Sequence, residues 1–364
     1  MTGIGEGVRA ALRPAARLAG VALLCAAAAA TAQEPGAARL DPRLEERLAA
    51  APGERVSVLV ALRPPAGPAA LRVPAPEAVL PRAERHVRAV RALRTNAARA
   101  QAGVLRALRE AERAGTAREV EPLWIANVVR ADVTPELLRE IAARPDVERV
   151  LLDRRVTLQE PAAASGPAGG LLAGEPISAL VTVRVPEAWD LGFTGTAMLV
   201  ANLDSGVQGD HPALAGKWRG LRVPVEQAWF DPFLNSTFPV DDDPAFGTGA
   251  NGHGTATMGL MVAGERSIGV AFDAEWIAAN IFENNQSFIS TILKGLQWAT
   301  DPDGDPATVV DVPDVINASF GLMEIDSTGS PTDTGICDVV FDEAVDAAGA
   351  AGAVVVFSAG NFDV

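Results

Sequence analysis

The segment with the clearest chemical character is Asn251-Gly252-His253-Gly254-Thr255, in which a histidine stands between two glycines. Small residues and then an apolar run follow, so we expect a turn that leads into a closely packed helix. An imidazole at the start of such a helix titrates near neutral pH and suits the role of a general base. The chain has only three histidines, so few other side chains could take this role. A glycine-rich turn with an incidental histidine would be the more common explanation of the segment if it stood alone.

Two polar residues that follow strand-like runs are candidate partners for this histidine. Asp204 comes directly after the apolar run at residues 198–203, and Asn361 follows the run at residues 353–359. A carboxylate can accept the ring N–H of a histidine and hold one tautomer, and an amide can donate to a developing oxyanion. Either residue alone is also a common turn residue at a strand end.

The C-terminal half has the pattern of an α/β fold with a parallel sheet and helices on both faces. Strand-like runs lie at residues 198–203, 276–282, 315–318 and 353–359, and helical patterns lie between them at residues 255–263, 288–299 and 338–351. In such folds the site lies beyond the carboxyl ends of the strands. That rule selects Asp204, the segment Ser319-Phe320-Gly321, and Gly360-Asn361.

Residues 54–158 have a different pattern, which predicts a small α+β, ferredoxin-like domain. Strands are expected at residues 54–63, 120–133 and 147–158, with a long helix at 83–113 and a short helix opened by Thr134-Pro135. The apolar positions of the long helix recur every three or four residues, and its arginines are expected to form a solvated surface.

Charge is distributed unevenly between the two halves. Residues 1–160 carry 25 Lys and Arg against 19 Asp and Glu, whereas residues 161–364 carry 6 against 27. Opposite charge favours attraction between the halves. Nucleic-acid binding is a poor fit, because the basic half lacks interleaved aromatic residues and the acidic half would repel phosphates.

The first 32 residues have the pattern of a signal peptide. Three arginines precede an apolar run at residues 18–30, and Ala30-Thr31-Ala32 offers a small-residue cleavage site. The run is too short to span a bilayer, and the bulky Leu24 before Cys25 argues against a lipid anchor. We therefore expect a secreted protein, extracellular or periplasmic, without a stable membrane anchor. Removal of the signal would leave Cys337 as the single cysteine, so no internal disulfide is expected.

Taken together, four segments resemble the subtilisin-like serine peptidases, and the insertion after Trp298 is most similar to the bacillopeptidase F branch. They are Val200-Ala201-Asn202-Leu203-Asp204-Ser205-Gly206-Val207, Asn251-Gly252-His253-Gly254-Thr255, Val315-Ile316-Asn317-Ala318-Ser319-Phe320-Gly321 and Phe357-Ser358-Ala359-Gly360-Asn361. The resemblance implies a signal peptide at residues 1–32, a propeptide at 33–160, a linker and activation region at 161–185, and a catalytic domain at 186–364.

The resemblance also implies a role for each site residue. His253 would be the general base and then the general acid, Asp204 its orienting partner and Asn361 an oxyanion donor. Ser319, Phe320 and Gly321 would pair with the backbone of a polypeptide substrate. Ser358, Ala359 and Gly360 would line the pocket for the residue before the scissile bond. The propeptide would dock on the catalytic domain as its own inhibitor.

One departure from the family pattern is severe. The nucleophilic serine of this family belongs to a Gly-Thr-Ser motif after the oxyanion asparagine, and the chain has no such motif. We expect the serine to lie beyond Val364 and this chain alone to be inactive. The alternative is a pseudopeptidase that binds peptides without cleaving them.

Two acidic runs offer oxygen ligands at spacings that calcium accepts. They are Asp241-Asp242-Asp243 and the alternating Asp301, Asp303 and Asp305. The chemistry itself needs no cofactor, but relatives commonly bind calcium, so a structural calcium ion is one interpretation. Solvated acidic turns are the more common explanation, and a calcium-dependent surface module without hydrolytic activity is a third hypothesis for the whole chain.

Overall fold

The structure is a computed structural model that describes residues 38–64, 80–158, 176–241, 252–264, 266–321, 323–325, 331–332 and 339–359. The predicted signal peptide, most of the linker, both cysteines, Gly360 and Asn361 lie outside these ranges. Within them, no helix combines the length and the apolar character that crossing a membrane would need.

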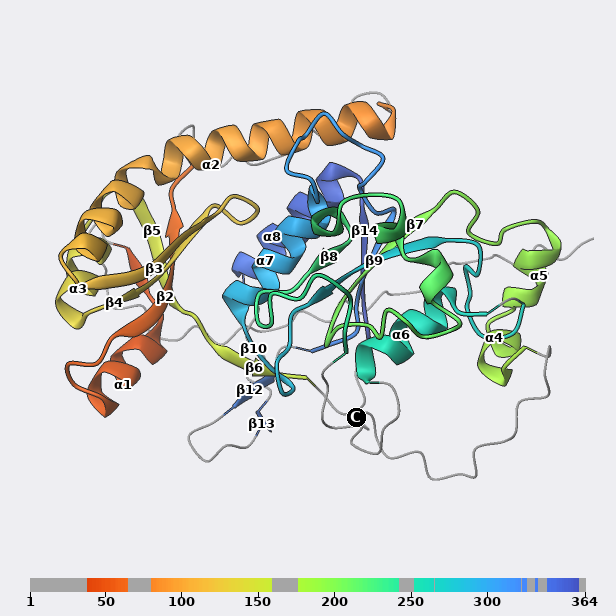
Figure 1. The fold of residues 1–364 in the computed structure, drawn as a ribbon. Coiled ribbons are helices and arrows are strands. Elements are labelled where there is room, and N and C mark those ends of the chain that lie inside the picture. The colour runs from red at the N-terminus through yellow and green to blue at the C-terminus, as the bar shows by residue number, and fades with distance from the viewer. Residues whose placement is uncertain are drawn as a thin grey trace, which may run out of the picture. The chain divides into compact units, whose positions relative to one another are not determined.

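The N-terminal part of the described chain builds a five-stranded sheet of order β1-β5-β2-β4-β3 (Figure 1). Its elements are β1 (Arg39–Leu40), α1 (Pro42–Ala50), β2 (Val56–Leu62), α2 (Arg82–Arg113), β3 (Ala117–Leu123), β4 (Val128–Val133), α3 (Pro135–Ala142) and β5 (Val147–Leu152). The run β2-α2-β3-β4-α3-β5 with this strand order is the ferredoxin-like arrangement that the sequence predicted. The region expected to be one strand at residues 120–133 is a hairpin of two strands, β3 and β4.

The helices of this part begin and pack where the sequence predicted. Thr134 caps α3, since its hydroxyl accepts a hydrogen bond from the backbone N–H of Leu137, and Pro135 occupies the first turn. Val90, Val104 and other positions three or four apart along α2 are buried. The sheet and helices therefore share one apolar core.

The C-terminal part builds a parallel sheet of order β14-β11-β7-β9-β8. Its elements are α4 (Ser178–Thr182), α5 (Val185–Asp190), β7 (Leu199–Asp204), β8 (Trp229–Phe230), α6 (His253–Val262), β9 (Glu275–Asn280), α7 (Ile289–Thr300), β11 (Val315–Ala318), α8 (Val339–Ala351) and β14 (Val354–Phe357). Three short 3₁₀ turns, at Ala215–Lys217, Arg219–Leu221 and Val225–Gln227, precede β8. Figure 1 shows α7 and α8 on one side of this sheet and α6 on the other. The predicted α/β fold is confirmed.

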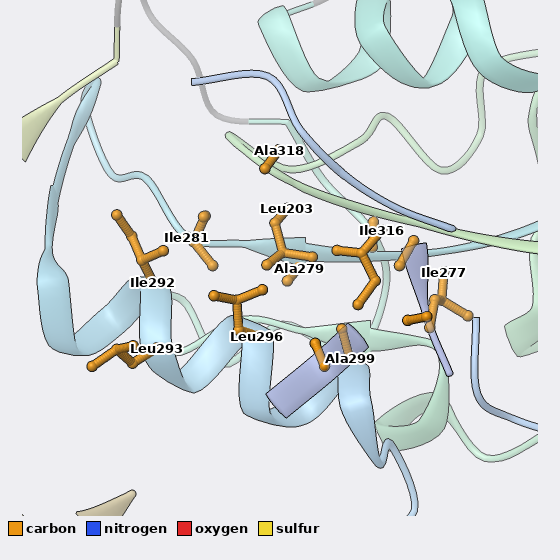
Figure 2. Close-up of a cluster of buried hydrophobic side chains, with 14 of the residues drawn as sticks. Leu203, Ile277, Ala279, Ile281, Ile292, Leu293, Leu296, Ala299, Ile316 and Ala318 are labelled. Carbon is orange, nitrogen blue, oxygen red and sulfur yellow. The ribbon is translucent and has the colours of Figure 1, made fainter. Parts of the chain in front are cut away.

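Strand β7 is buried on both faces, which explains its nearly continuous apolar sequence. Leu203 points toward α7, where Leu296 lies below it and below Ala279 of β9, and Ile292 lies beside Ile281 (Figure 2). Successive side chains of a strand alternate between faces, so Asn202 and Asp204 point the opposite way, toward α6. The strand therefore uses one face for the apolar core and the other for polar contacts.

A small third sheet joins the two parts of the chain. Its strands are β6 (Arg155–Thr157), β10 (Gln286–Phe288), β12 (Met323–Ile325) and β13 (Pro331–Thr332), in the order β10-β6-β12-β13. β6 is antiparallel to both β10 and β12. The strand predicted at residues 147–158 is thus broken into β5 and β6, and β6 leaves the first sheet to pair with segments more than 100 residues further along the chain.

Candidate active site

Asp204 and His253 meet at the carboxyl end of β7. The Nδ1 atom of His253 lies 2.7 Å from Oδ1 of Asp204, and the carboxylate is fully buried. His253 occupies the first turn of α6, and its side chain is 12% exposed. A carboxylate on Nδ1 orients the ring and leaves proton exchange with a substrate or nucleophile to Nε2.

The glycines beside His253 are required by close packing. A Cβ atom on Gly254 would lie 2.0 Å from the carbonyl oxygen of Gly206 and 3.0 Å from Cβ of Asp204. A Cβ atom on Gly252 would lie 2.1 Å from Oδ1 of Asp241. The first turn of α6 can therefore approach the end of β7 only because these two positions lack side chains.

Asp204 is held by two further hydrogen bonds. The backbone N–H of Ser205 donates to Oδ1 at 2.8 Å, and the Thr257 hydroxyl lies 3.0 Å from Oδ2. Thr257 in turn lies 3.0 Å from the Asn202 amide nitrogen, which also donates to the carbonyl oxygen of Gly254. Both oxygens of the carboxylate are thus engaged from α6, in a site sealed from solvent.

A second carboxylate, Asp241, fastens the first turn of α6 to the end of β7. It accepts hydrogen bonds from the backbone N–H of Thr255 at 2.8 Å and from the Ser205 hydroxyl at 3.0 Å. The helix begins at Gly252, which has no side chain to cap it, so Asp241 supplies the capping oxygen from elsewhere in the chain. Burial raises the pKa of Asp241 to about 6, although its hydrogen bonds with Thr255 and Ser205 oppose the shift.

The end of β11 carries the residues expected to contact substrate. The Asn317 amide donates to Oδ1 of Asn202 at 2.9 Å and to the Ser319 hydroxyl at 2.8 Å. Phe320 is 3% exposed and packs against three phenylalanines. Its backbone, rather than its ring, is therefore the part that a peptide could reach.

The neighbouring strand end brings Ser358 close to β11. The backbone N–H of Ser358 donates to the carbonyl oxygen of Ala318, and Ser358 and Ala359 are exposed. Asp204 is the last residue of β7, and Ser319 and Ser358 follow β11 and β14, so the three residues lie at the ends of adjacent strands of one sheet. The strand-end rule had selected Asp204 and Ser319. Gly360 and Asn361 lie outside the described residues, so the predicted oxyanion donor stays a prediction.

Metal ligands do not gather in the described part of the chain, which contains no group of three or more His, Cys, Asp or Glu side chains suited to a metal ion. Asp241 is occupied by Thr255 and Ser205, and Asp242 and Asp243 lie outside the described residues. In the second acidic run, Asp301 pairs with Arg94. No group suited to calcium is therefore observed among the described carboxylates of these runs.

Asn202 and Thr257 were not singled out from the sequence, and Asp241 was singled out only as a possible calcium ligand. Asn202 interrupts an apolar strand two residues before Asp204, and Thr257 lies one helical turn after His253. Asn202 could have been noticed, because a polar side chain in a buried strand needs a hydrogen-bond partner. Thr257 could have been noticed because it lies on the same helix face as His253. Asp241 carried no such signal for capping, since its partner Thr255 lies 14 residues further along the chain.

Comparisons with known proteins agree with this geometry. Residues 195–364 match the Subtilase family. Bacillopeptidase F of Bacillus subtilis is 30% identical over 295 residues, which cover 76% of this chain and 19% of that protein. Subtilisin E of Bacillus subtilis is 30% identical over 183 residues, which cover 49% of this chain and 38% of that protein. The chain therefore spans well under half the length of both relatives.

A solved structure shares the fold. The S393A mutant of the epidermin leader peptide processing serine protease from Staphylococcus aureus superposes with a TM-score of 0.51 at 15% identity. The match covers 85% of this chain and 61% of that one.

Proposed function

Because residues 195–364 form a domain of the subtilase family, we propose that the protein is the zymogen of a secreted serine endopeptidase that hydrolyses polypeptides. The contact between His253 Nδ1 and Asp204 Oδ1 is the observation that carries this proposal. It supplies an oriented imidazole at the carboxyl end of a parallel sheet, where ligands of such folds bind.

The proposed reaction is acyl transfer through an Asp-His-Ser triad. A serine hydroxyl attacks the scissile carbonyl while Nε2 of His253 takes its proton, and Asp204 stabilises the imidazolium that forms. His253 then gives the proton to the leaving amine, and water repeats the sequence to release the acyl group. Asn361 would donate its amide to the oxyanion, and the backbone of Ser319-Phe320-Gly321 would pair with the substrate. No cofactor takes part in these steps.

The nucleophile is proposed to come from residues outside 186–364, since this range contains no Gly-Thr-Ser motif. The test is to read the coding sequence downstream and express the complete product. A fluorophosphonate probe should label it at the predicted serine, and His253→Ala should abolish labelling. A complete product that lacks the serine and resists the probe would instead support the alternative function, a pseudopeptidase that binds peptides.

Contacts between residues 38–158 and residues 199–357 support the zymogen part of the proposal. Asp153 accepts hydrogen bonds from the backbone N–H and hydroxyl of Ser290, and so caps the first turn of α7. Arg82 lies 3.0 Å from Asp314, and Gln297 accepts the backbone N–H of Trp124 at 2.7 Å. Arg82 also donates to three backbone carbonyl oxygens, so not every arginine of α2 forms the solvated surface that was predicted.

Strand β6 supports an inhibitory role for this N-terminal region. It pairs with β10 on one side and with β12 on the other. β12 comes shortly after Ser319-Phe320-Gly321, the segment proposed to pair with substrate. Val156, in the middle of β6, is fully buried. A strand that completes a sheet in this way would occupy the edges that an extended substrate needs. We propose that residues 33–160 are the propeptide, that cleavage falls within 161–185, and that 186–364 belong to the catalytic domain.

Val156→Asp tests the inhibitory contact in the complete product. An unpaired charge in this buried position should weaken the pairing of β6, so that the uncleaved protein hydrolyses a small peptide ester. Thr157→Ser is the matched control on the same strand, because it keeps the hydroxyl that bonds to Asn285. Equal latency in both variants would remove the inhibitory role of β6 while leaving the peptidase proposal intact.

The remaining parts of the proposal concern location and metal content. Residues 1–32 would direct secretion without a stable membrane anchor, and no nucleic acid partner is expected. The structural calcium ion is proposed from the two acidic runs of the sequence. Chelation that leaves the thermal unfolding midpoint unchanged would exclude it.

A further inference from the structure

Two residues on one face of α6 bind the two oxygens of Asp204. His253 and Thr257 are four positions apart, a spacing that places side chains on the same face of a helix. The ring nitrogen of His253 lies 2.7 Å from Oδ1, and the Thr257 hydroxyl lies 3.0 Å from Oδ2. Both oxygens of the carboxylate are therefore held by side chains of a single helix.

The hydroxyl proton of Thr257 has two acceptors within reach. One is Oδ2 of Asp204 at 3.0 Å, and the other is the carbonyl oxygen of Gly254 at 3.1 Å. A hydroxyl has one proton to donate, so it can make only one of these bonds at a time. Threonine in a helix often donates to the carbonyl one turn earlier, which would leave Oδ2 without this donor.

Asn202 decides between the two acceptors. Its amide nitrogen donates one proton to the carbonyl oxygen of Gly254 at 3.0 Å and the other to the Thr257 hydroxyl oxygen at 3.0 Å. The carbonyl thus already accepts one proton, and the hydroxyl, which accepts from Asn202, donates its own proton to the charged carboxylate, the stronger acceptor. The orientation of the Asn202 amide is itself fixed, because its Oδ1 accepts a proton from Asn317 at 2.9 Å.

Burial increases the effect of losing any hydrogen bond in this series. Asn202 and Asp204 are both 0% exposed, so water does not replace a lost partner. A hydrogen bond to an ionised carboxylate is roughly twice as strong as one between neutral groups, and a low local dielectric strengthens it further. One proton from each of Asn317, Asn202 and Thr257 is donated in the direction of Asp204.

We infer that Thr257 is a positioning residue for Asp204, with its proton directed by Asn202, so that Oδ1 of the carboxylate faces Nδ1 of His253. This inference rests on the proposed function for its catalytic meaning, but the geometry can be tested without turnover. Because Asn317 also donates to the Ser319 hydroxyl at 2.8 Å, the same network joins the proposed substrate strand to the carboxylate.

The first test is nuclear magnetic resonance of the full chain labelled with ¹⁵N-histidine. The protein has only three histidines, and His253→Ala identifies the signal of interest. The wild type should show an Nδ1-protonated ring with a strongly downfield proton. Thr257→Val, which keeps the shape but lacks the hydroxyl, should move that proton upfield and broaden it. Thr257→Ser, which keeps the hydroxyl, should restore the wild-type position.

Two outcomes would overturn the inference: an Nδ1 proton of Thr257→Val that stays at the wild-type position or moves further downfield, or a Thr257→Ser variant that behaves like Thr257→Val. If Thr257→Val does not fold, Thr257→Ala removes the same hydroxyl without placing a methyl group against the carboxylate, and the same outcomes apply. Circular dichroism of each variant establishes that the fold is retained.

The second test separates this inference from the proposed function. In the complete product, Thr257→Val should lower kcat about tenfold with KM unchanged, equivalent to about 1.4 kcal/mol of transition-state stabilisation, and Thr257→Ser should stay within about twofold of wild type. A protein that hydrolyses nothing and resists the fluorophosphonate probe contradicts the proposed function. The position of the His253 Nδ1 proton then still tests whether Thr257 positions Asp204. A hydrolase whose kcat is equal in all three forms contradicts only the role of Thr257.

Discussion

His253 and Asp204 are 49 residues apart in the chain, yet their side chains meet at 2.7 Å because β7 ends where α6 begins. The contact brings together the predicted general base and its predicted orienting partner. Its chemical meaning depends on the negative charge of Asp204, since a neutral partner could not stabilise an imidazolium.

Asp204→Asn tests that dependence. The amide keeps the size of the carboxylate but can donate to Nδ1, which favours the wrong tautomer of His253. In the complete product we expect kcat/KM to fall by roughly 10⁴-fold, the order found when a triad aspartate is replaced in this way. Steady-state kinetics measures the loss, and an unchanged circular dichroism spectrum is the control for folding. A loss below about tenfold would argue against a triad at this position.

Gly254→Ala tests the close approach of α6 to β7. Alanine favours helix over glycine, but its Cβ atom would lie 2.0 Å from the carbonyl oxygen of Gly206. We expect the free energy of unfolding to fall by about 2 kcal/mol. The matched control is Gly259→Ala in the same helix, where the nearest atom lies at 3.9 Å and a gain of about 0.5 kcal/mol is expected. Urea denaturation compares the two, and equal effects would contradict the packing argument.

Local patterns predicted most of the fold. The spacing of apolar residues indicated α2, and the apolar run at residues 315–318 corresponds to β11 residue for residue. The position of Asp204 followed from a general rule on strand ends. These features depend on neighbours within one helix or strand, so the sequence carries them directly.

Long-range partners could not be predicted in the same way. The strand at residues 147–158 reads as one run, but it breaks at Asp153, whose carboxylate is engaged by Ser290 more than 130 residues away. Likewise, nothing near Asp241 indicates that it caps α6, and nothing near Asn202 indicates which acceptor it will satisfy. The partners in such hydrogen bonds are far apart in the sequence and come together only in the folded chain, so the structure is needed to identify them.

Asp311 should make the protein less stable as the pH rises through the acidic range. Burial and the nearby charge of Asp303 raise its pKa to about 6 from the usual 3.8. Between these values the folded state keeps a proton that the unfolded state has released, so the free energy of unfolding falls as pH increases and the loss is complete above about pH 6. Asp311→Asn removes this ionisation and should recover about 2 kcal/mol at neutral pH.

Urea denaturation in EDTA between about pH 4 and pH 7 checks this expectation. Asp305→Asn is the control, because it removes one negative charge from an exposed position of the same loop. That variant should keep most of the pH dependence of the wild type, because the charge of Asp305 adds to burial in raising the pKa of Asp301, whereas the pKa of Asp311 is raised by burial and by the charges of Asp303 and Asp301. A pH dependence in Asp311→Asn as steep as in the wild type would contradict the assignment.

His86 of α2 should make the contact with α8 sensitive to acid. Its ring is fully buried, with Nδ1 3.2 Å from the carbonyl oxygen of Ala351, and burial lowers its pKa below the usual 6.5, an effect that the charges of Arg82 and Arg94 increase. Below pH 6.5 the unfolded state takes up a proton before the folded state does, so the free energy of unfolding decreases as the pH falls through this range.

His86→Gln isolates this effect, because glutamine can still donate to the carbonyl of Ala351 but does not titrate. At pH 8 the variant should unfold at a midpoint equal to or slightly below that of the wild type, through a loss of about 1 kcal/mol. At pH 5.5 the difference should shrink or reverse, since only the wild type bears the cost of a buried charge. Other titrating groups, including Asp311, are common to both proteins and cancel in the comparison. A difference between the two midpoints that stays constant with pH would show that His86 is not the group responsible.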